Sequence, residues 1–421
     1  MSIKTTLEQI GAAAQKLKNE ATAGGSQMYY IGDVIGDLVE VTEQIHSQME
    51  NGSVSDDELA AIQGANSPNA TNSFATMNDL SDISGLSIQS AVVVETTSNA
   101  KTNGAALIAA YTAAKALTPN GEELSATNRA CVIIPPGNYD LDHGEDDACV
   151  PLTLDTEFVD IIGLTTDRSL QQIYGTPEAT NSGVIVQTAD DVHVSNLYVK
   201  ILTEVESANW NDTDSAAYFP STSLSNTVVD NCQFDGQDGS NDEGPRLFSM
   251  RLYIEYSGTF TNCTGGYSAF GGGGGTASGT FTNCTGGDNS FGGAGGTASG
   301  TFTNCTGGGY SFGGGGTASG TFNYCTGGDY SFGGDEGTAS GTFTNCTGGA
   351  GAFGRGGTAS GTFTNCTGGN SAFGGAGGTL SGQLYYCRLT TGSFQTLAVG
   401  GKLRACVDGS DTFIATREYE G

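Results

Sequence analysis

Three groups of acidic residues mark the places where this chain could do chemistry. One follows a Pro-Gly turn, one pairs two aspartates with a histidine, and one lies on a glycine-rich stretch: Asp140, Asp142, His143, Glu145, Asp146 and Asp147; Asp190, Asp191 and His193; Asp235, Asp238, Asp242 and Glu243. Two carboxyl groups about 5–5.5 Å or 6.5–9.5 Å apart can hydrolyse a glycosidic bond. A chain with 45 acidic residues forms such groups by chance. We therefore assign no catalytic residue and favour a function other than catalysis.

The third acidic group is also a candidate metal site. Carboxylates supply the hard oxygen ligands that Ca²⁺ prefers, although this group lacks the spacing of an EF-hand loop. Ca²⁺ is the one cofactor that the sequence suggests, and its candidate ligands are Asp235, Asp238, Asp242 and Glu243.

Aromatic residues beside carboxylates suggest sites for a sugar. The only tryptophan, Trp210, lies in a long insertion with Asp212, Asp214, Tyr218 and Phe219. An alternative is that Trp210 and Phe219 fold back as a lid on the protein wall. Two further tyrosines, Tyr310 and Tyr330, occupy variable positions of a repeat that we expect to face solvent, and we add them to the ligand-binding candidates.

A unit of about twenty residues is repeated along part of this chain. Between residues 257 and 387 the sequence Ala-Ser-Gly-Thr-Phe-Thr-Asn-Cys-Thr-Gly-Gly recurs almost unchanged, followed by a phenylalanine and a glycine run. Its cysteines are 20 or 21 residues apart: Cys263, Cys284, Cys305, Cys325, Cys346, Cys366 and Cys387. Such self-similarity indicates a solenoid, in which each unit buries its apolar face against its neighbours.

Within one unit the residues alternate as they do in a strand. Ala277, Gly279 and Phe281 alternate with polar residues, and Cys284 returns to an inward position after Asn283. Glycine at this density is unfavourable in helices. The unit therefore predicts one coil of a parallel β-helix, with Phe stacked on Phe and Cys on Cys. The one-residue variation in length falls in the glycine run, which we expect to form an adaptable corner.

The Asn-Cys-Thr motif has two interpretations. It is formally a glycosylation sequon, but we favour an asparagine ladder that lines a turn and satisfies backbone groups. The eleven cysteines lack a Cys-x-x-Cys pattern and are expected to be reduced, buried thiols.

The amino-acid composition limits the kinds of partner that the protein can bind. The net charge of −30 argues against nucleic acid and anionic membranes. No apolar run is long enough to span a membrane, and no signal peptide is evident. We expect synthesis in a cytoplasm without a secretory leader.

The N-terminal region has helical periodicity. Apolar residues at heptad spacing over 3–17 and 31–45 predict two short helices. They could pack on one another, or they could form a bundle of identical chains, which we favour. We expect a helical attachment and oligomerisation segment at 1–50, a connector at 51–84, capped irregular coils at 85–256, and regular coils with a C-terminal cap at 257–421. A helix over 105–116 is expected to cap the open end of the solenoid.

Two segments resemble known families. Asp57-Glu58-Leu59-Ala60-Ala61-Ile62-Gln63-Gly64-Ala65-Asn66-Ser67-Pro68, followed by Asn72-Ser73-Phe74-Ala75-Thr76-Met77, resembles a segment of bacteriophage tail-fibre and related virion proteins, which usually have proline where this chain has Ser73. Cys131-Val132-Ile133-Ile134-Pro135-Pro136-Gly137-Asn138-Tyr139-Asp140-Leu141 resembles the first coil of pectate-lyase-like β-helices, phage tailspikes among them. The resemblances imply a right-handed parallel β-helix, a homotrimer and a place in the virion.

These observations lead to one preferred function and two alternatives. The preferred function is a structural phage fibre or spike subunit that binds other virion proteins through its N-terminal segment and contributes to attachment to host-surface glycan. One alternative is a polysaccharide depolymerase on the same fold. The other is a passive capsid or collar decoration or filament protein.

Overall fold

The chain divides into two units, Met1–Ile88 and Gln89–Gly421. The computed structural model describes residues 90–177, 183–202, 216–220, 226–236, 248–250 and 255–419, all in the second unit. The expected helical segment and the connector lie outside the described residues, as does the phage-like segment.

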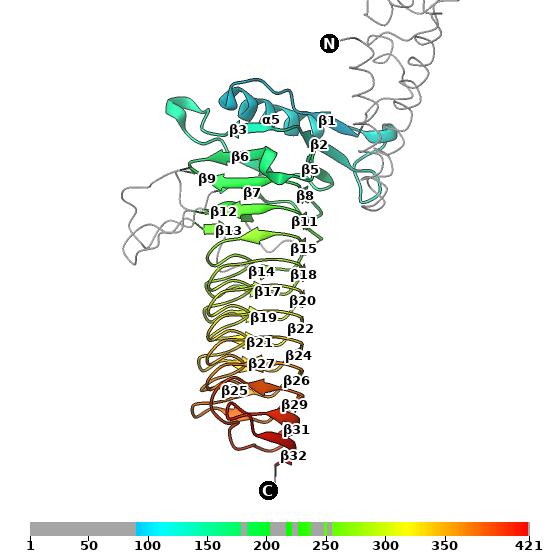
Figure 1. Ribbon diagram of the computed structural model, residues 1–421. Coiled ribbons are helices and arrows are strands. Elements are labelled where there is room, and N and C mark those ends of the chain that lie inside the picture. The colour runs from blue at the N-terminus through cyan, green and yellow to red at the C-terminus, as the bar shows by residue number, and fades with distance from the viewer. Residues whose placement is uncertain are drawn as a thin grey trace, which may run out of the picture. The chain divides into compact units, whose positions relative to one another are not determined.

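The described part of the chain is a mainly β protein, and its strands form a parallel β-helix (Figure 1). One long sheet runs along the coil axis, and its strands follow in the order β1 (Ala91–Val93), β2 (Ala130–Ile134), β5 (Val159–Gly163), β8 (His193–Ser195), β11 (Val228–Asp230), β15 (Thr259–Thr261), β18 (Thr280–Thr282), β20 (Thr301–Thr303), β22 (Thr321–Asn323), β24 (Thr342–Thr344), β26 (Thr362–Thr364), β29 (Gln383–Tyr385) and β31 (Lys402–Val407). β31 also pairs with β30 (Arg388–Leu389), which pairs with β27 (Thr367–Gly368).

Three shorter sheets form the remaining walls. In the regular coils the second wall contains β14 (Glu255–Tyr256), β17 (Thr276–Ala277), β19 (Thr297–Ala298), β21 (Thr317–Ala318), β23 (Thr338–Ala339), β25 (Thr358–Ala359) and β28 (Thr379–Leu380). The irregular coils contribute a sheet of β4 (Leu152–Leu154), β7 (Gly183–Gln187), β10 (Ala216–Pro220) and β13 (Phe248–Met250), and a sheet of β3 (Gly137–Asp140), β6 (Gln171–Gly175), β9 (Tyr198–Ile201), β12 (Gln233–Asp235) and β16 (Thr264–Gly265).

The predicted helical cap is present as α5 (Ala100–Ala114), which packs against β1, β2 and β3. Asn99 caps its N-terminus by accepting a hydrogen bond from the backbone N–H of Thr102 at 3.0 Å. A Cβ on Gly104 would lie 1.9 Å from the carbonyl oxygen of Asp140, so the close approach of the helix to β3 requires glycine. Single turns of 3₁₀ helix, η1 (Pro119–Gly121), η2 (Glu145–Asp147) and η3 (Arg168–Leu170), lie in connections between the strands.

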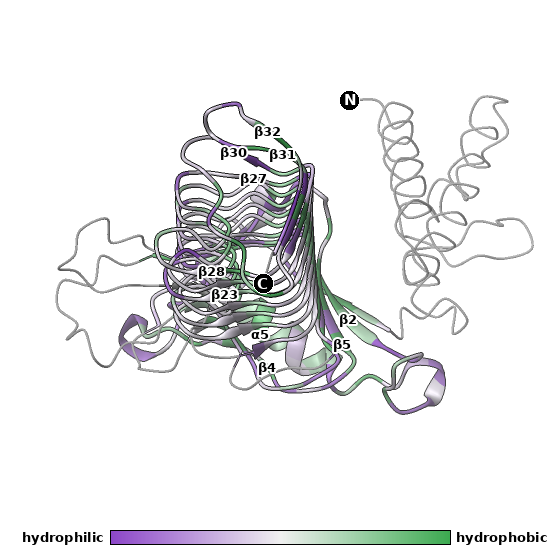
Figure 2. Cartoon of the chain, turned by 90° about the horizontal axis from the view of Figure 1, so that it is seen from below, coloured by the Kyte–Doolittle hydropathy of each residue, from purple (hydrophilic) through white to green (hydrophobic). Residues whose placement is uncertain are grey.

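The last irregular coil pairs in register with the first regular one. Val229 pairs with Phe260, and Phe234 pairs with Gly265, a shift of 31 residues in both cases. The regular half is therefore a continuation of the same coil, and viewed along the axis its turns lie over one another (Figure 2).

The core of the regular half is a herringbone of phenylalanines. Phe281, Phe302 and Phe322 stack in one column with ring centroids 5.0 and 4.8 Å apart and interplanar angles of 4° and 3°. A second column, which includes Phe291 and Phe312, meets the first edge-on at 75–87° between rings, for example 86° between Phe302 and Phe312. All these rings are fully buried. The predicted inward stacking is confirmed.

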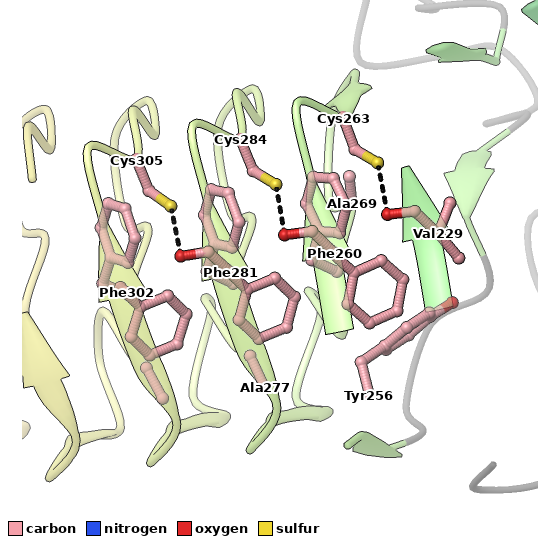
Figure 3. Packing of buried hydrophobic residues seen from close by; sticks show 14 of the residues in the cluster. Val229, Tyr256, Phe260, Cys263, Ala269, Ala277, Phe281, Cys284, Phe302 and Cys305 are labelled. Atoms are coloured by element: carbon pink, nitrogen blue, oxygen red, sulfur yellow. Dashed lines mark hydrogen bonds between the residues drawn. The ribbon is translucent and has the colours of Figure 1, made fainter. Parts of the chain in front are cut away.

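The cysteines form a third buried column beside these rings (Figure 3). Each thiol donates a weak hydrogen bond to the carbonyl of the preceding coil, as from Cys284 to Phe260 and from Cys305 to Phe281, both at 3.3 Å. The described cysteines are free, as expected. Burial raises the pKa of the Cys387 thiol to about 12.

Several corners use left-handed backbone, which the sequence did not reveal. Phe291 and its equivalents adopt positive φ (52° for Phe291), a conformation that bulky residues rarely take. We attribute its persistence to the buried ring, which the herringbone holds in place. The following glycine corner absorbs the length variation as predicted: the longer coils carry one extra residue there, such as Ala294 at φ 48°.

The asparagine ladder exists, but its expected role is wrong. Asn283 and Asn304 are exposed, and the side chain of Asn304 donates to the Asn283 side chain at 3.2 Å rather than to a buried backbone group. Both residues are left-handed, with φ of 53° and 52°. Asparagine suits these corners because it tolerates that conformation. Tyr324 occupies the same position in another coil and is 62% exposed.

At the far end, β32 (Phe413–Glu418) pairs antiparallel with β31 and ends the parallel stack. The expected C-terminal cap over residues 411–421 is thus a strand that folds back on the last coil.

Candidate functional site

Tyr310 and Tyr330 lie together on the wall of the regular coils. They occupy equivalent left-handed corner positions in successive coils, with φ of 52° and 55°. Their ring centroids are 5.0 Å apart and the rings are tilted by 31°. Both side chains are half-buried, so each ring keeps part of its surface in contact with solvent.

Two charged residues complete this group. The Arg355 guanidinium lies 5.0 Å from the centroid of the Tyr330 ring, and its Nη1 is 3.5 Å from Oδ1 of Asp335. Partial burial, followed by the nearby Asp335 carboxylate, raises the pKa of Tyr310. We call Tyr310, Tyr330, Asp335 and Arg355 the tyrosine cluster. Aromatic surface beside a cation and a carboxylate can bind a polyhydroxylated ligand through stacking and hydrogen bonds.

One candidate of the insertion, Tyr218, does not lie on the surface as the sequence suggested. Tyr218 is 1% exposed, its hydroxyl donates to Gln187 Oε1, and its ring lies 5.1 Å from that of Phe234. Tyr218 is therefore a core residue, and its candidacy as a surface ligand contact is wrong. Trp210, Asp212 and Asp214 lie outside the described residues.

Of the candidate Ca²⁺ ligands, the structure describes only Asp235. Its carboxylate accepts hydrogen bonds from the Tyr198 hydroxyl at 2.6 Å and from the Gln233 side chain at 2.9 Å. Asp238, Asp242 and Glu243 lie outside the described residues. Within the part of the chain that the structure describes, no three His, Cys, Asp or Glu side chains gather as a metal site would require.

Two carboxylates of the first acidic group, those of Asp142 and Asp147, make local contacts. Asp142 accepts from the backbone N–H of Thr176 at 2.6 Å and Asp147 pairs with Lys101 at 2.6 Å. These contacts give the carboxylates a structural role in the loop between the helix and the coils.

The second acidic group leads to a buried ion pair that the sequence analysis missed. Asp160 on β5 is adjacent to His193 on β8, with 3.7 Å between His193 Nδ1 and Asp160 Oδ2. The Arg129 side chain donates through Nε to the same oxygen at 2.8 Å, and the Asp160 side chain is only 3% exposed. Burial lowers the pKa of His193. A charged residue within the apolar strand Val159–Gly163 was the available signal.

The arrangement of these groups favours structure over acid–base chemistry. Arg129 neutralises Asp160, and Asp160 also accepts from the His193 backbone N–H at 2.9 Å. The Asp160 carboxylate thus accepts three hydrogen bonds, two from Arg129 and one from the His193 backbone, and this arrangement gives it a structural role. The tyrosine cluster, in contrast, combines aromatic rings and charged groups that are partly open to solvent, and we take it as the candidate site.

Comparison with known proteins adds little to these observations. The chain matches no protein-family model, and a search by sequence finds no characterised relative. Among solved structures it is similar to pectin methylesterase PemA from Erwinia chrysanthemi, at 11% identity and a TM-score of 0.30 over 68% of this chain and 80% of that one. A pectin methylesterase in complex with a hexasaccharide gives 14% identity and a TM-score of 0.28 over 67% and 80%.

A likeness of this size supports no conclusion about activity. The β-helix itself is established by the strand pairing described above. No helix in the described ranges is both long and apolar enough to cross a membrane.

Proposed function

We propose that this protein is a structural subunit of a bacteriophage fibre or spike, and that the tyrosine cluster contributes to attachment to host-surface glycan. The observation that supports this best is the unbroken parallel stack from β1 to β31. Such a stack is a rod whose backbone groups are paired from coil to coil, and a rod is suited to hold one part of an assembly away from another.

The ring stacking shows how regularly the coils of this rod repeat. Successive phenylalanines in the strand column are rotated by only 3–7° relative to one another. Adjacent strands in ordinary sheets are rotated by about 20–25°. The regular coils therefore repeat with almost pure translation, and every coil is held by its neighbours through identical contacts.

The chemistry of the surface restricts the glycan. A chain with a net charge of −30 repels polyanions at low ionic strength. Tyr310 and Tyr330 offer aromatic surface, and Asp335 and Arg355 offer hydrogen-bonding groups. A neutral or basic polysaccharide that contacts the side of the rod fits this combination.

Labelling of phage particles tests the place of the protein in a virion. An antibody against residues 257–387, viewed by electron microscopy, should label the tail tip or baseplate. Label on the capsid or collar would favour the decoration alternative, and particles without label would refute the virion assignment. Light scattering of the full chain should give a trimer mass, and a monomer mass would contradict the homotrimer.

Glycan binding is tested with matched variants. The Tyr310→Ala/Tyr330→Ala double variant should lose binding on a glycan array, whereas Tyr324→Ala, which removes an exposed tyrosine from another column, should retain it. Equal binding by all three proteins would refute the tyrosine cluster as the site. Release of reducing or unsaturated sugar ends from a bound glycan would replace attachment by the depolymerase alternative.

A further inference from the structure

The outer face of the long sheet carries a lattice of threonines. Two outward columns run through six consecutive strands, one residue on each side of the inward phenylalanine, and strand pairing holds the equivalent residues in register. The first column is Thr259, Thr280, Thr301, Thr321, Thr342 and Thr362, and the second is Thr261, Thr282, Thr303, Asn323, Thr344 and Thr364. We call these twelve residues the threonine lattice.

The lattice is open to solvent and uncharged. Residues of the first column are exposed and those of the second are half-buried. In the described part of the chain, no threonine hydroxyl of the lattice has a hydrogen-bond partner within the protein. The twelve positions of the lattice carry no charged residue, whereas His193 and Asp230 lie in the same columns beyond one end and Lys402 and Arg404 beyond the other.

The lattice is also flat and evenly spaced. The phenylalanine rings between the two threonine columns stack at 4.8–5.0 Å with interplanar angles of 3–7°, which limits the tilt of one strand against the next. Along a strand, residues two positions apart are separated by about 6.7 Å. The β-branched side chain of threonine has few χ1 rotamers, so each hydroxyl and methyl group is held in a narrow range of positions.

These properties restrict the ligand. One neutral hydroxyl contributes little to binding in water, so a ligand must contact many of them at once and must repeat in two directions with spacings of this size. A flexible chain or a globular partner lacks such a repeat, and an ionic surface would select charged side chains. Ice is a solid of neutral hydrogen-bond donors and acceptors whose faces repeat with spacings in this range.

We propose that the threonine lattice binds an ordered layer of water and, through it, the surface of ice. The threonine methyl groups hold water molecules in cages while the hydroxyl groups anchor them, and the flat sheet lets all six strands contact one crystal face together. This inference is independent of the fibre assignment, because it concerns a different face from the tyrosine cluster.

The experiment measures thermal hysteresis and ice-crystal shape with the full-length chain. The double variant Thr301→Lys/Thr342→Lys places two long charged side chains on the lattice. The control Thr306→Lys/Thr347→Lys makes the same change in the same two coils, at exposed threonines outside the two columns. The wild type and the control should give faceted crystals and a hysteresis gap, and the lattice variant should lose most of the gap.

Three results would overturn the proposal. The wild type could show no hysteresis, or both double variants could lose it equally. Sedimentation could also show that only the lattice variant has a smaller oligomer than the wild type, in which case a second copy of the chain covers this face. Circular dichroism of both variants must match the wild type, and Thr301→Ser/Thr342→Ser supplies a milder change should the lysine pair unfold the coils.

Discussion

Replacing Phe302 by alanine tests the organisation of the core. The Phe302 ring is fully buried, stacks on two rings at 5.0 and 4.8 Å, and meets two more edge-on at 5.9 and 5.6 Å. A buried Phe→Ala change costs about 3–5 kcal/mol, depending on how far the site can collapse. Each aromatic pair adds about 0.5–1.5 kcal/mol beyond its buried area. Rigid coils on both sides hinder collapse, so we expect the upper part of the range.

The assay must resolve single coils, because the stability of a solenoid is close to a sum of coil and neighbour terms. Amide hydrogen exchange over residues 297–325 should show the loss locally, and urea denaturation gives the effect on the whole chain. Phe302→Leu should cost less, since Leu384 occupies this column naturally in a later coil. Thr306→Ala, at an exposed position, is the surface control. A loss below about 1 kcal/mol for Phe302→Ala would refute the herringbone as the source of stability.

Three further predictions concern a corner, the buried thiols and the buried ion pair. Asn304→Ala should cost about 1 kcal/mol in urea denaturation, because alanine is strained at positive φ, whereas Asn304→Gly should cost almost nothing; equal losses would remove the conformational explanation. Burial raises the thiol pKa values of Cys131 and Cys387 from 9.0 to about 12, so the native state holds these protons longer than the unfolded chain does. The stability they contribute is complete below pH 9 and should be lost between pH 9 and 12, by about 1.4 kcal/mol per pH unit for each thiol; a urea midpoint that is constant across this interval would contradict the burial. Arg129→Ala should cost about 3–5 kcal/mol by leaving the Asp160 carboxylate buried without its partner, and the double variant Arg129→Ala/Asp160→Asn should recover part of that loss in the same assay; no recovery would mean that Arg129 stabilises the fold by packing alone.

The regular half of the fold could be predicted from its sequence because the repeat determines which residues point inward and which point outward. Once Phe281 and Cys284 are taken as inward, each equivalent residue in the other coils follows. The same repeat misled us about Asn304. Its recurrence suggested a ladder that satisfies backbone groups in a turn. The recurrence instead reflects the left-handed backbone of this corner, which the alternation of inward and outward residues does not reveal. The left-handed φ of Phe291 was hidden for the same reason.

The irregular half has no repeat from which the inward residues could be identified. Tyr218 was taken as a surface residue because it follows Trp210 and two aspartates in the same insertion, but β10 places it beside Gln187 and Phe234 in the interior. The Arg129–Asp160 pair joins residues from separate coils whose spacing differs from the regular period. Tyr310 and Tyr330 were recognised as candidates from their variable positions, but the contacts of Asp335 and Arg355 with them depend on how the glycine corner folds.

The near absence of rotation between coils has a consequence for how the molecule can change in length. If residues 297–316 were deleted, Thr317 would pair with Thr276, and Phe322 would stack on Phe281 in the place of Phe302. Every contact type of the core would remain, although Tyr310 would be lost with the deleted coil, and the protein would become shorter by one coil, about 4.8 Å. Because neighbouring repeats are nearly identical, unequal recombination between them would make such changes in a single event. The length of the rod can therefore change during evolution in steps of one coil, without any change in how its core is packed.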